Sequence, residues 1–497
     1  MIEKLHKNII FNLSRYFSFY LFSIILLVIS PIGNLSGNEE MYYGLAKKFT
    51  DSNWNGVFSS FIASGDYRII SDSLIGYMVS FFGFEGTQII GSILASFLFA
   101  HAITKLFNLL DISNVHGLLS IIIFILIGQS LIGREWLFED FEAKIFSYYF
   151  VLLGIKSYLQ EKNYQIALYL SLATYFHLLV GFSWFALLLA SSVIHNRHYV
   201  IAVKSFMLYV LLSSPILIIA AYGFLGGEFI QDPNLPSPSY IYSYIRQYKM
   251  VLPFYSVSTF VVDWLPGILV HIGLLVGIIF LNTEEDHNLN KLLSLLVVST
   301  IIIFVLLLIS LFDNEGVLAK FYPYRYTSLL LLLFITFYTS NLKLAMKDLK
   351  ANLSLVGVII LLPLLLITAA IKSAFEFQEI YLDDNSKDKL YEFISSNTNA
   401  GEIVLIQPEI EEIFFDFERK VNRPTLVTFK YIPSSKVGLT EWFKRREFKA
   451  QVFNRETNPV SYYPYSYILV NVQSKSKYID QEIIYENSKY TLFTNLR

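Results

Sequence analysis

The sequence contains no cysteine and few charged residues. Without cysteine among its 497 residues, the chain has no disulfide framework, no thiolate nucleophile and no cysteine-ligated metal site. Lys, Arg, Asp and Glu make up 16% of the residues, against roughly 25% in average soluble domains. The formal net charge of −2 gives no basis for a nucleic-acid partner. These scarcities argue against a secreted disulfide scaffold and against a protein that is soluble throughout.

Several catalytic motifs are also missing. The sequence has no HExxH, no P-loop, no GxSxG and no glycine-rich dinucleotide motif. Metalloprotease, ATPase, α/β-hydrolase and Rossmann-type functions therefore have no support.

Apolar residues are abundant instead, at 54% of the chain. Repeated apolar runs are long enough to cross a hydrocarbon core of ~30 Å, which predicts a polytopic α-helical membrane protein. We expect about 11 transmembrane segments, with boundaries good to about 2–4 residues. They are predicted at about 15–33, 88–107, 117–132, 145–159, 164–178, 179–194, 200–225, 266–281, 292–312, 326–341 and 352–372.

The loops assigned to one side of the membrane are short and basic, as the positive-inside rule requires of cytoplasmic loops. Their cations are Lys105, Lys156, Lys162, Arg197, Lys204, Lys291, Lys343, Lys347 and Lys350. We therefore expect a cytoplasmic N-terminus, with the first apolar run retained as a helix. An odd number of crossings then places the C-terminus outside.

Two apolar stretches are too short for regular crossings. Residues 165–194 cannot form two complete spans at about 1.5 Å per residue, so we expect two short helices that meet near His177 and Gly181. Residues 73–84 are predicted to form a helix that lies in the membrane interface on the outer side.

The composition becomes polar after Lys372, which predicts two domains. Residues 1–372 form a transmembrane domain with outer loops at 33–88, 133–144 and 226–266, and residues 373–497 form a small extracytoplasmic α/β domain. In the second domain we expect helices at about 385–396 and 439–453 and another that begins at Pro408. Strands are expected at about 402–407, 425–429, 467–472, 481–486 and 490–494.

The first candidate site is the acidic pair Glu39 and Glu40, directly after the first apolar run. A carboxylate at a lipid boundary can act as a general base or bind a divalent cation, and partial desolvation would raise its pKa toward a useful range. The alternative is that the two acids only begin a helix and solvate a loop. Mg²⁺ or Mn²⁺ thus stays open as a cofactor, although no ligand spacing demands a metal site.

The second candidate site is the outer loop from Arg134 to Glu142, where acids alternate with aromatic residues. Acids can hydrogen-bond sugar hydroxyls while aromatic rings stack on the apolar face of the sugar. An ordinary amphipathic interfacial segment is the alternative. The acids of interest are Glu135, Glu139 and Asp140.

Cationic residues near the later outer loops are candidates for binding a phosphate. Arg325 stands at the start of a predicted span with Lys320 five residues before it, and Arg246 lies in the third loop. A snorkelling interface anchor is the alternative for each arginine. His177 in its apolar surroundings either lines a cavity or packs with a satisfied hydrogen bond.

In layout the chain resembles a GT-C membrane glycosyltransferase. The shared features are a first helix, a long outer loop that opens with Asn38-Glu39-Glu40-Met41-Tyr42, a second acidic outer loop, short broken helices and a C-terminal outer domain. The tail segments Phe417-Glu418-Arg419 and Trp442-Phe443-Lys444-Arg445 are similar to those of bacterial members with this architecture. The chain lacks the Asp-Asp pair of the first loop and the WWD-type signature of oligosaccharyltransferases.

The resemblance implies a transferase of the bacterial inner membrane that takes a sugar from a polyprenyl-phosphate donor to a glycan, lipid or protein acceptor. It implies a catalytic role for Glu39 or Glu40, and Tyr42 is expected to line the cavity. Glu139 and Asp140 would act as second-loop acids, and Arg325 and Arg134 would hold the lipid phosphate. This assignment needs the acids and the cations to share one external pocket.

Two other functions stay open from the sequence. A transporter or flippase of lipid-linked glycans could line its path with the same acids and arginines. A glycan ligase is chemically close to the transferase and takes a longer donor.

Overall fold

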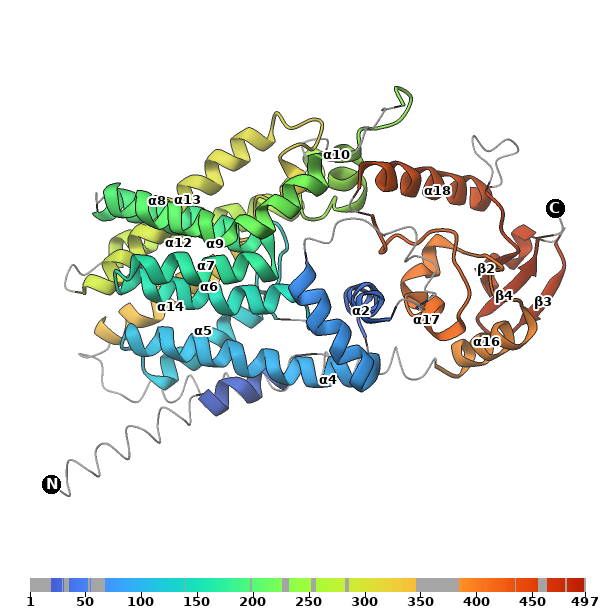
Figure 1. Ribbon diagram of the computed structural model, residues 1–497, viewed down its shortest axis with the longest axis horizontal. Helices are drawn as coiled ribbons and strands as arrows, with labels where there is room; N and C mark the ends of the chain where they lie inside the picture. Colours follow the sequence, from blue (N-terminus) through green and yellow to red (C-terminus); the bar gives the residue numbers. More distant parts are fainter. Residues whose placement is uncertain are drawn as a thin grey trace, which may run out of the picture. The chain divides into compact units, whose positions relative to one another are not determined.

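The structure is a computed structural model, and it confirms a mostly helical chain that carries a small C-terminal sheet. The described residues are 19–28, 30, 35–51, 54, 68–138, 140–196, 199–225, 232–251, 256–281, 286–345, 384–433, 435–454, 463–478 and 481–495. The chain packs as two units (Figure 1). Unit 1 comprises Met1–Gly33, Gln88–Ala221 and Tyr242–Ala369, and unit 2 comprises Asn34–Thr87, Tyr222–Ile241 and Ala370–Arg497.

The long helices belong mainly to unit 1. They are α4 (Ile69–Leu109), α5 (Asn114–Leu126), α6 (Ala143–Leu159), α7 (Asn163–Phe176), α8 (Leu178–Asn196), α9 (Tyr199–Leu225), α12 (Leu265–Leu281), α13 (His287–Ser310) and α14 (Thr327–Ala345). Short helical turns precede α12 at α10 (Pro238–Tyr240), η1 (Ile241–Arg246), α11 (Val257–Thr259) and η2 (Phe260–Trp264), and η3 (Ala319–Phe321) precedes α14.

Within the described residues, five helices are long and apolar enough to cross a membrane. They are Ile69–Leu109, Leu178–His195, Tyr199–Ala221, Val257–Ile279 and His287–Ser310. The shorter apolar helices Phe19–Val28, Asn114–Leu126 and Thr327–Ser340 fall within or overlap further predicted spans. The predicted span at 352–372 lies outside the described residues. A membrane protein with several spanning helices is supported, and eleven crossings stay a prediction.

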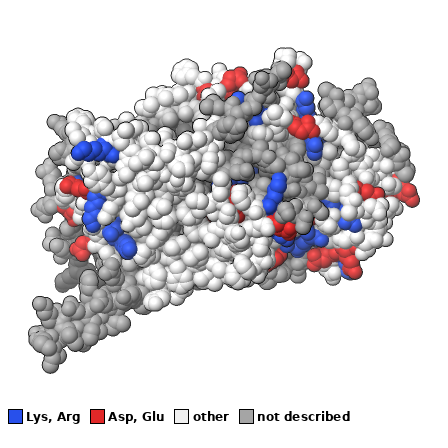
Figure 2. All heavy atoms as spheres, in the orientation of Figure 1, with Lys and Arg blue, Asp and Glu red and all other residues white. Residues whose placement is uncertain are grey.

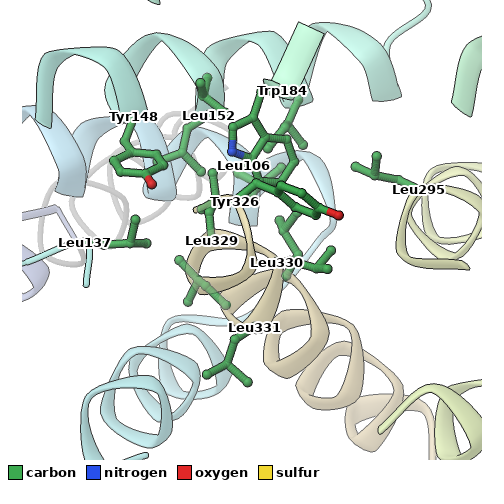
Figure 3. Packing of buried hydrophobic residues seen from close by; sticks show 14 of the residues in the cluster. Leu106, Leu137, Tyr148, Leu152, Trp184, Leu295, Tyr326, Leu329, Leu330 and Leu331 are labelled. Atoms are coloured by element: carbon green, nitrogen blue, oxygen red, sulfur yellow. The ribbon is translucent and has the colours of Figure 1, made fainter. Parts of the chain in front are cut away.

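The core of unit 1 surrounds α14. Residues 329–334 of this helix are each at most 2% exposed, as expected for a helix that is apolar on every face. Tyr326 meets Trp184 of α8 edge to face, with ring centroids 6.3 Å apart, and Leu329 and Leu330 fill the adjoining space (Figure 3). This packing fixes the position of Arg325, which stands just before α14. Over this unit, the face seen in Figure 2 carries mainly uncharged side chains.

The break expected near His177 is present. α7 ends at Phe176, His177 has an extended backbone, and α8 begins at Leu178. Gly181 packs closely here, because a Cβ at this position would lie 2.3 Å from the backbone nitrogen of Thr174. The two helices pack against each other and against α6.

The helix expected at 73–84 is also present, as the first part of α4. The helical backbone is interrupted at Gly83, where φ is 72° and ψ is −179°. This region of backbone space is essentially restricted to glycine. The interruption separates a surface helix, residues 69–82, from the apolar helix that follows.

Unit 2 combines the first loop with the C-terminal sequence. Its elements are α2 (Gly37–Thr50), α16 (Asp384–Asn397), β1 (Val404–Ile406), η4 (Pro408–Phe414), α17 (Phe417–Val421), α18 (Lys436–Asn454), β2 (Tyr467–Asn471), η5 (Val472–Tyr478), β3 (Ile483–Glu486) and β4 (Tyr490–Thr494). The sheet order is β1-β2-β4-β3, with β1 parallel to β2 and the other pairs antiparallel. The elements predicted after residue 384 are therefore largely confirmed.

One predicted strand is wrong. Residues 425–429 form only a single bridge, between Thr425 and Val404. The polar backbone groups of this segment are instead satisfied by side chains: Trp442 donates to the Thr428 carbonyl at 2.8 Å, and Glu411 accepts from the Phe429 amide. A β-rich composition was overridden by these side-chain contacts.

Glu411 links residues 425–429 to α18 through hydrogen bonds and ion pairs. Its Oε2 atom accepts from Lys449 at 2.7 Å and from Arg446 at 2.8 Å. Burial raises the pKa of Glu411, but attraction by Lys449 and Arg446 outweighs burial, so the pKa lies below its usual value. The carboxylate is therefore charged at neutral pH and fully paired.

We expect Glu411→Gln to loosen this segment, because removing one member of a buried ion pair typically costs about 3–5 kcal/mol. Hydrogen–deuterium exchange of peptides that cover 425–431 should accelerate by about a hundredfold, the factor that corresponds to ~3 kcal/mol. Glu412→Gln, at the exposed neighbouring residue, is the matched control. Equal exchange in the two variants would contradict a structural role for the ion pairs.

Candidate functional site

Glu39 caps the start of α2. Its Oε2 atom accepts from the Ser36 amide at 3.0 Å while the Ser36 hydroxyl accepts from the Glu39 amide at 3.1 Å, which is a capping box. The other carboxylate oxygen accepts from the Tyr43 hydroxyl at 3.3 Å. Both oxygens of this fully buried side chain are therefore engaged within the helix that carries it.

Glu40 is held by an arginine from the C-terminal sequence. Nε of Arg419 lies 2.9 Å from Oε2 of Glu40, and Nη2 of Arg419 lies 2.5 Å from Oε1, which is a bidentate ion pair. Nη1 of Arg419 binds Glu85 at 2.9 Å, and its guanidinium lies 4.8 Å from the centre of the Phe84 ring. All four residues lie within unit 2.

The pKa of Glu40 is raised. Burial is the largest influence and raises it, while the hydrogen bonds and charge of Arg419 lower it. The charges of Asp416 and Glu85 raise it further. The proton affinity of Glu40 is thus shifted toward that of a general base.

Tyr42 and the rest of α2 support this arrangement. The ring of Tyr42 lies 4.6 Å from the Arg68 guanidinium and packs beside Met41 and Tyr431. A Cβ at Gly37 would lie 2.5 Å from the Phe415 ring, so glycine permits the close approach of this turn to the C-terminal sequence. The acidic pair is therefore set by packing within unit 2.

A second group of charges lies in unit 1, and we name it the Glu135 cluster. Its members are Glu135, Lys144, His177 and Arg325. Nζ of Lys144 donates to Oε1 of Glu135 at 3.0 Å. Nε of Arg325 lies 3.2 Å from Oε2, close enough for an ion pair although outside hydrogen-bond geometry. Nη1 of Arg325 lies 2.7 Å from Nε2 of His177.

The Glu135 cluster is assembled by the ends of helices. Lys144 is in the first turn of α6, His177 immediately precedes α8, and Arg325 precedes α14. The side chains of Lys144 and Arg325 reach the Glu135 carboxylate from the starts of two of these helices, and helix N-termini themselves carry partial positive charge. One end of the bundle is thereby suited to an anion.

Burial makes these charges strongly interdependent. Glu135 is 3% exposed and Lys144 is 5% exposed. Burial raises the pKa of Glu135, but the attraction of Lys144 and Arg325 outweighs it and brings the pKa below its usual value. The pKa of Arg325 is raised because attraction to Glu135 outweighs its own burial. Glu135 and Arg325 are therefore both charged at neutral pH.

Aromatic residues border the cluster. The Arg325 guanidinium lies 4.5 Å from the centre of the Tyr322 ring, and Lys144 lies over Trp136. The Tyr148 hydroxyl donates to the Arg325 carbonyl at 3.2 Å. The quadrupole of an aromatic ring attracts a cation that lies over its face, which stabilises the positive charge there.

The remaining predicted residues are placed as follows. Arg134 forms an ion pair of 2.7 Å with Asp263 and is about half exposed. Asp140 is buried, and Glu139 lies outside the described residues. Burial raises the pKa of the Tyr322 hydroxyl, and Arg246 is close enough for its charge to oppose that rise. Lys320 lies 5.1 Å from the centre of the Phe321 ring.

The structure therefore brings together Glu135, His177 and Arg325, three residues that the sequence singled out separately. Glu39 and Glu40 belong to unit 2 and the Glu135 cluster to unit 1. Their expected meeting in one pocket stays a prediction, as do the roles assigned to each.

Two important cations were missed by sequence reasoning. Lys144 directly follows the acidic second loop, and that position could have suggested a partner for its acids. Arg419 is separated from Glu40 by 379 positions, and no local pattern relates the two. Among the described residues, no three His, Cys, Asp or Glu side chains are grouped to hold a metal ion.

No protein-family model matches the chain, and no curated protein matches it.

We expect Arg325→Gln to destabilise the protein by about 3 kcal/mol, because Glu135 loses one of its two cations while it stays buried. The double variant Glu135→Gln/Arg325→Gln should recover about 1–3 kcal/mol relative to the sum of the single losses. Thermal unfolding of the detergent-solubilised protein measures both. Arg134→Gln is the matched control, since its half-exposed ion pair contributes at most about 1 kcal/mol. Strictly additive losses would contradict the coupling.

Proposed function

We propose that the protein is a membrane glycosyltransferase that moves a sugar from a polyprenyl-phosphate donor to an extracytoplasmic acceptor. The observation that carries the proposal is the Glu135 cluster, in which Arg325 and Lys144 stand at the starts of helices in an apolar bundle. The resemblance in layout to GT-C enzymes supports the same reading. No sequence relative contributes to it.

The donor's chemistry matches this environment. A polyprenyl tail is soluble only in the bilayer, and its phosphate must be bound where cations meet the apolar bundle. Arginine presents paired donors to phosphate oxygens, and the partial positive charge of helix N-termini adds to the attraction. A guanidinium has five N–H donors, and the recorded contacts of Arg325 with His177 and Glu135 involve Nη1 and Nε.

In the proposed reaction Glu40 acts as the general base, since its raised pKa suits it to take a proton. It removes the proton of an acceptor hydroxyl as the hydroxyl oxygen forms a bond to the anomeric carbon. The bond between that carbon and the phosphate oxygen breaks, and polyprenyl phosphate leaves with the electron pair. Arg325 and Lys144 stabilise the negative charge of the departing phosphate. In-line displacement inverts the anomeric centre.

The other residues receive supporting roles. Glu39 sets the orientation of α2 through the capping box, and Arg419 positions the Glu40 carboxylate. Asp140 and Glu139 are proposed to bind sugar hydroxyls, and Arg246, Lys320 and Arg134 to add positive charge for the donor. The proposal places the protein in the bacterial inner membrane with its N-terminus in the cytoplasm and its C-terminal domain outside.

Sugar transfer in vesicles tests the proposal. The donors are polyprenyl-phosphate hexoses and pentoses, and the acceptors are membrane glycans and lipids. Glu40→Gln should lower the rate by about 10²–10⁴-fold, the usual contribution of a general base. Arg325→Gln should also lower it, because the leaving phosphate loses one of its two proposed cations. Glu412→Gln is the control at an exposed acid.

Two results would overturn the assignment. One is transfer retained when Glu39 and Glu40 are both changed. The other is failure of a lipid-linked sugar to cross the membrane in the same variants, which would favour the transporter.

The pH profile of transfer gives a further prediction. Because the base must be deprotonated and its pKa is raised, kcat/KM should fall on acidification at a pH above the usual range of glutamate. Arg419→Gln removes the cation that stabilises the charged form, so the midpoint of the fall should move to higher pH. A profile unchanged by Arg419→Gln would exclude Glu40 as the titrating base.

A further inference from the structure

The surface helix at residues 69–82 has an apolar stripe on its exposed side. The stripe consists of Ile70, Leu74, Tyr77 and Phe81, which are 42%, 38%, 59% and 79% exposed. Their spacing of four, three and four residues puts them on one face of a helix. Four large apolar side chains are thus presented in a row on the surface of unit 2.

The opposite face of the same helix is packed. Ile75 and Val79 are at most 3% exposed. A Cβ at Gly76 would lie 2.3 Å from the carbonyl oxygen of Ala46 in α2, and Thr50 binds Ser80 at 2.9 Å. The orientation of the helix about its own axis is therefore fixed by α2, and the outward direction of the stripe is a consequence of this packing.

Chain continuity indicates what covers the stripe. After Gly83 the same helix continues as an apolar segment of spanning character, in which Ile89, Ile93 and Phe97 are exposed. The stripe ends two residues before Gly83, so Phe81 is covalently held within a few ångströms of the start of that segment. Residue 70 is at most ~20 Å farther along the helix. Because the stripe is covalently joined to an apolar segment of spanning character, we infer that lipid lies close to it.

We propose that the stripe is a lipid-binding surface, which lies in the membrane interface with its aromatic residues at the level of the headgroups. A helix whose outward face is apolar and whose opposite face packs on protein offers a membrane the apolar surface that interfacial helices bury at the headgroup boundary. Tyr77 places a ring with one polar end at the boundary where such residues concentrate. The surface holds α2, which carries Glu39 and Glu40, at a fixed depth beside the bilayer.

The absence of native cysteine makes the test direct. The test uses three single-cysteine variants of the full-length protein, Leu74→Cys, Tyr77→Cys and Phe81→Cys. Each cysteine carries a bimane label, and each protein is reconstituted in vesicles of phosphatidylcholine and phosphatidylglycerol. Brominated phosphatidylcholine is the quencher. Ser476→Cys, at an exposed position of unit 2, is the control in water. Ile93→Cys, about 15 Å beyond Gly83 along the helix, is the control within the bilayer.

Labels on the stripe should be quenched severalfold more than the label at Ser476→Cys. Bromine near the headgroup should act on them more strongly than bromine near the chain end, with the reverse order at Ile93→Cys. Quenching of the stripe labels no greater than at Ser476→Cys would overturn the proposal. Concentration-dependent self-quenching without lipid quenching would overturn it as well, because a second copy of the chain would then cover the stripe. Neither result depends on sugar transfer.

Discussion

The packing of unit 1 depends on how a carboxylate is kept charged inside an apolar bundle. An isolated carboxylate at the depth of Glu135 would be neutralised, because desolvation disfavours its ionised form. Lys144 and Arg325 outweigh that cost from opposite oxygens of the same group. The pairing constrains where α6 and α14 begin, since each cation stands at the start of its helix. His177 extends the constraint to α8 through Arg325.

The balance between burial and nearby cations does not shift the pKa of every buried acid in the same direction. Glu411 has a lysine and an arginine, as Glu135 does, and its pKa is lowered as well. Glu40 has one arginine, which it shares with Glu85, and its pKa is raised. Two cations therefore overcome burial and one shared cation does not. This difference sets the raised pKa of Glu40 apart from the lowered pKa values of Glu135 and Glu411.

Helical periodicity, apolar runs and the change of composition after Lys372 were sufficient to predict most elements. The break at His177 followed from chain length alone, and the sheet strands from short β-branched runs. The pairing partners were not predictable, because Glu40 and Arg419 meet through the packing of unit 2 and no local spacing relates them. The expected strand at 425–429 failed for a similar reason: distant side chains satisfied its backbone groups. Glu39 and Glu40 look equivalent in sequence, and the structure distinguishes them by the capping box of Glu39 and the Arg419 ion pair of Glu40.

Gly83 gives α4 an unusual freedom in how its two segments are related. In an unbroken helix each residue advances the side-chain direction by a fixed angle, so the outward face of one segment dictates the outward face of the next. The non-helical residue removes this dependence. The rotation of the first segment about its axis can then be set by its packing on α2. The rotation of the second segment can be set separately by the helices that it contacts in the bundle. A substitution that restored regular helix at this position would fix the side-chain directions of one segment relative to those of the other. One of the two packing surfaces would then be turned away from its partner.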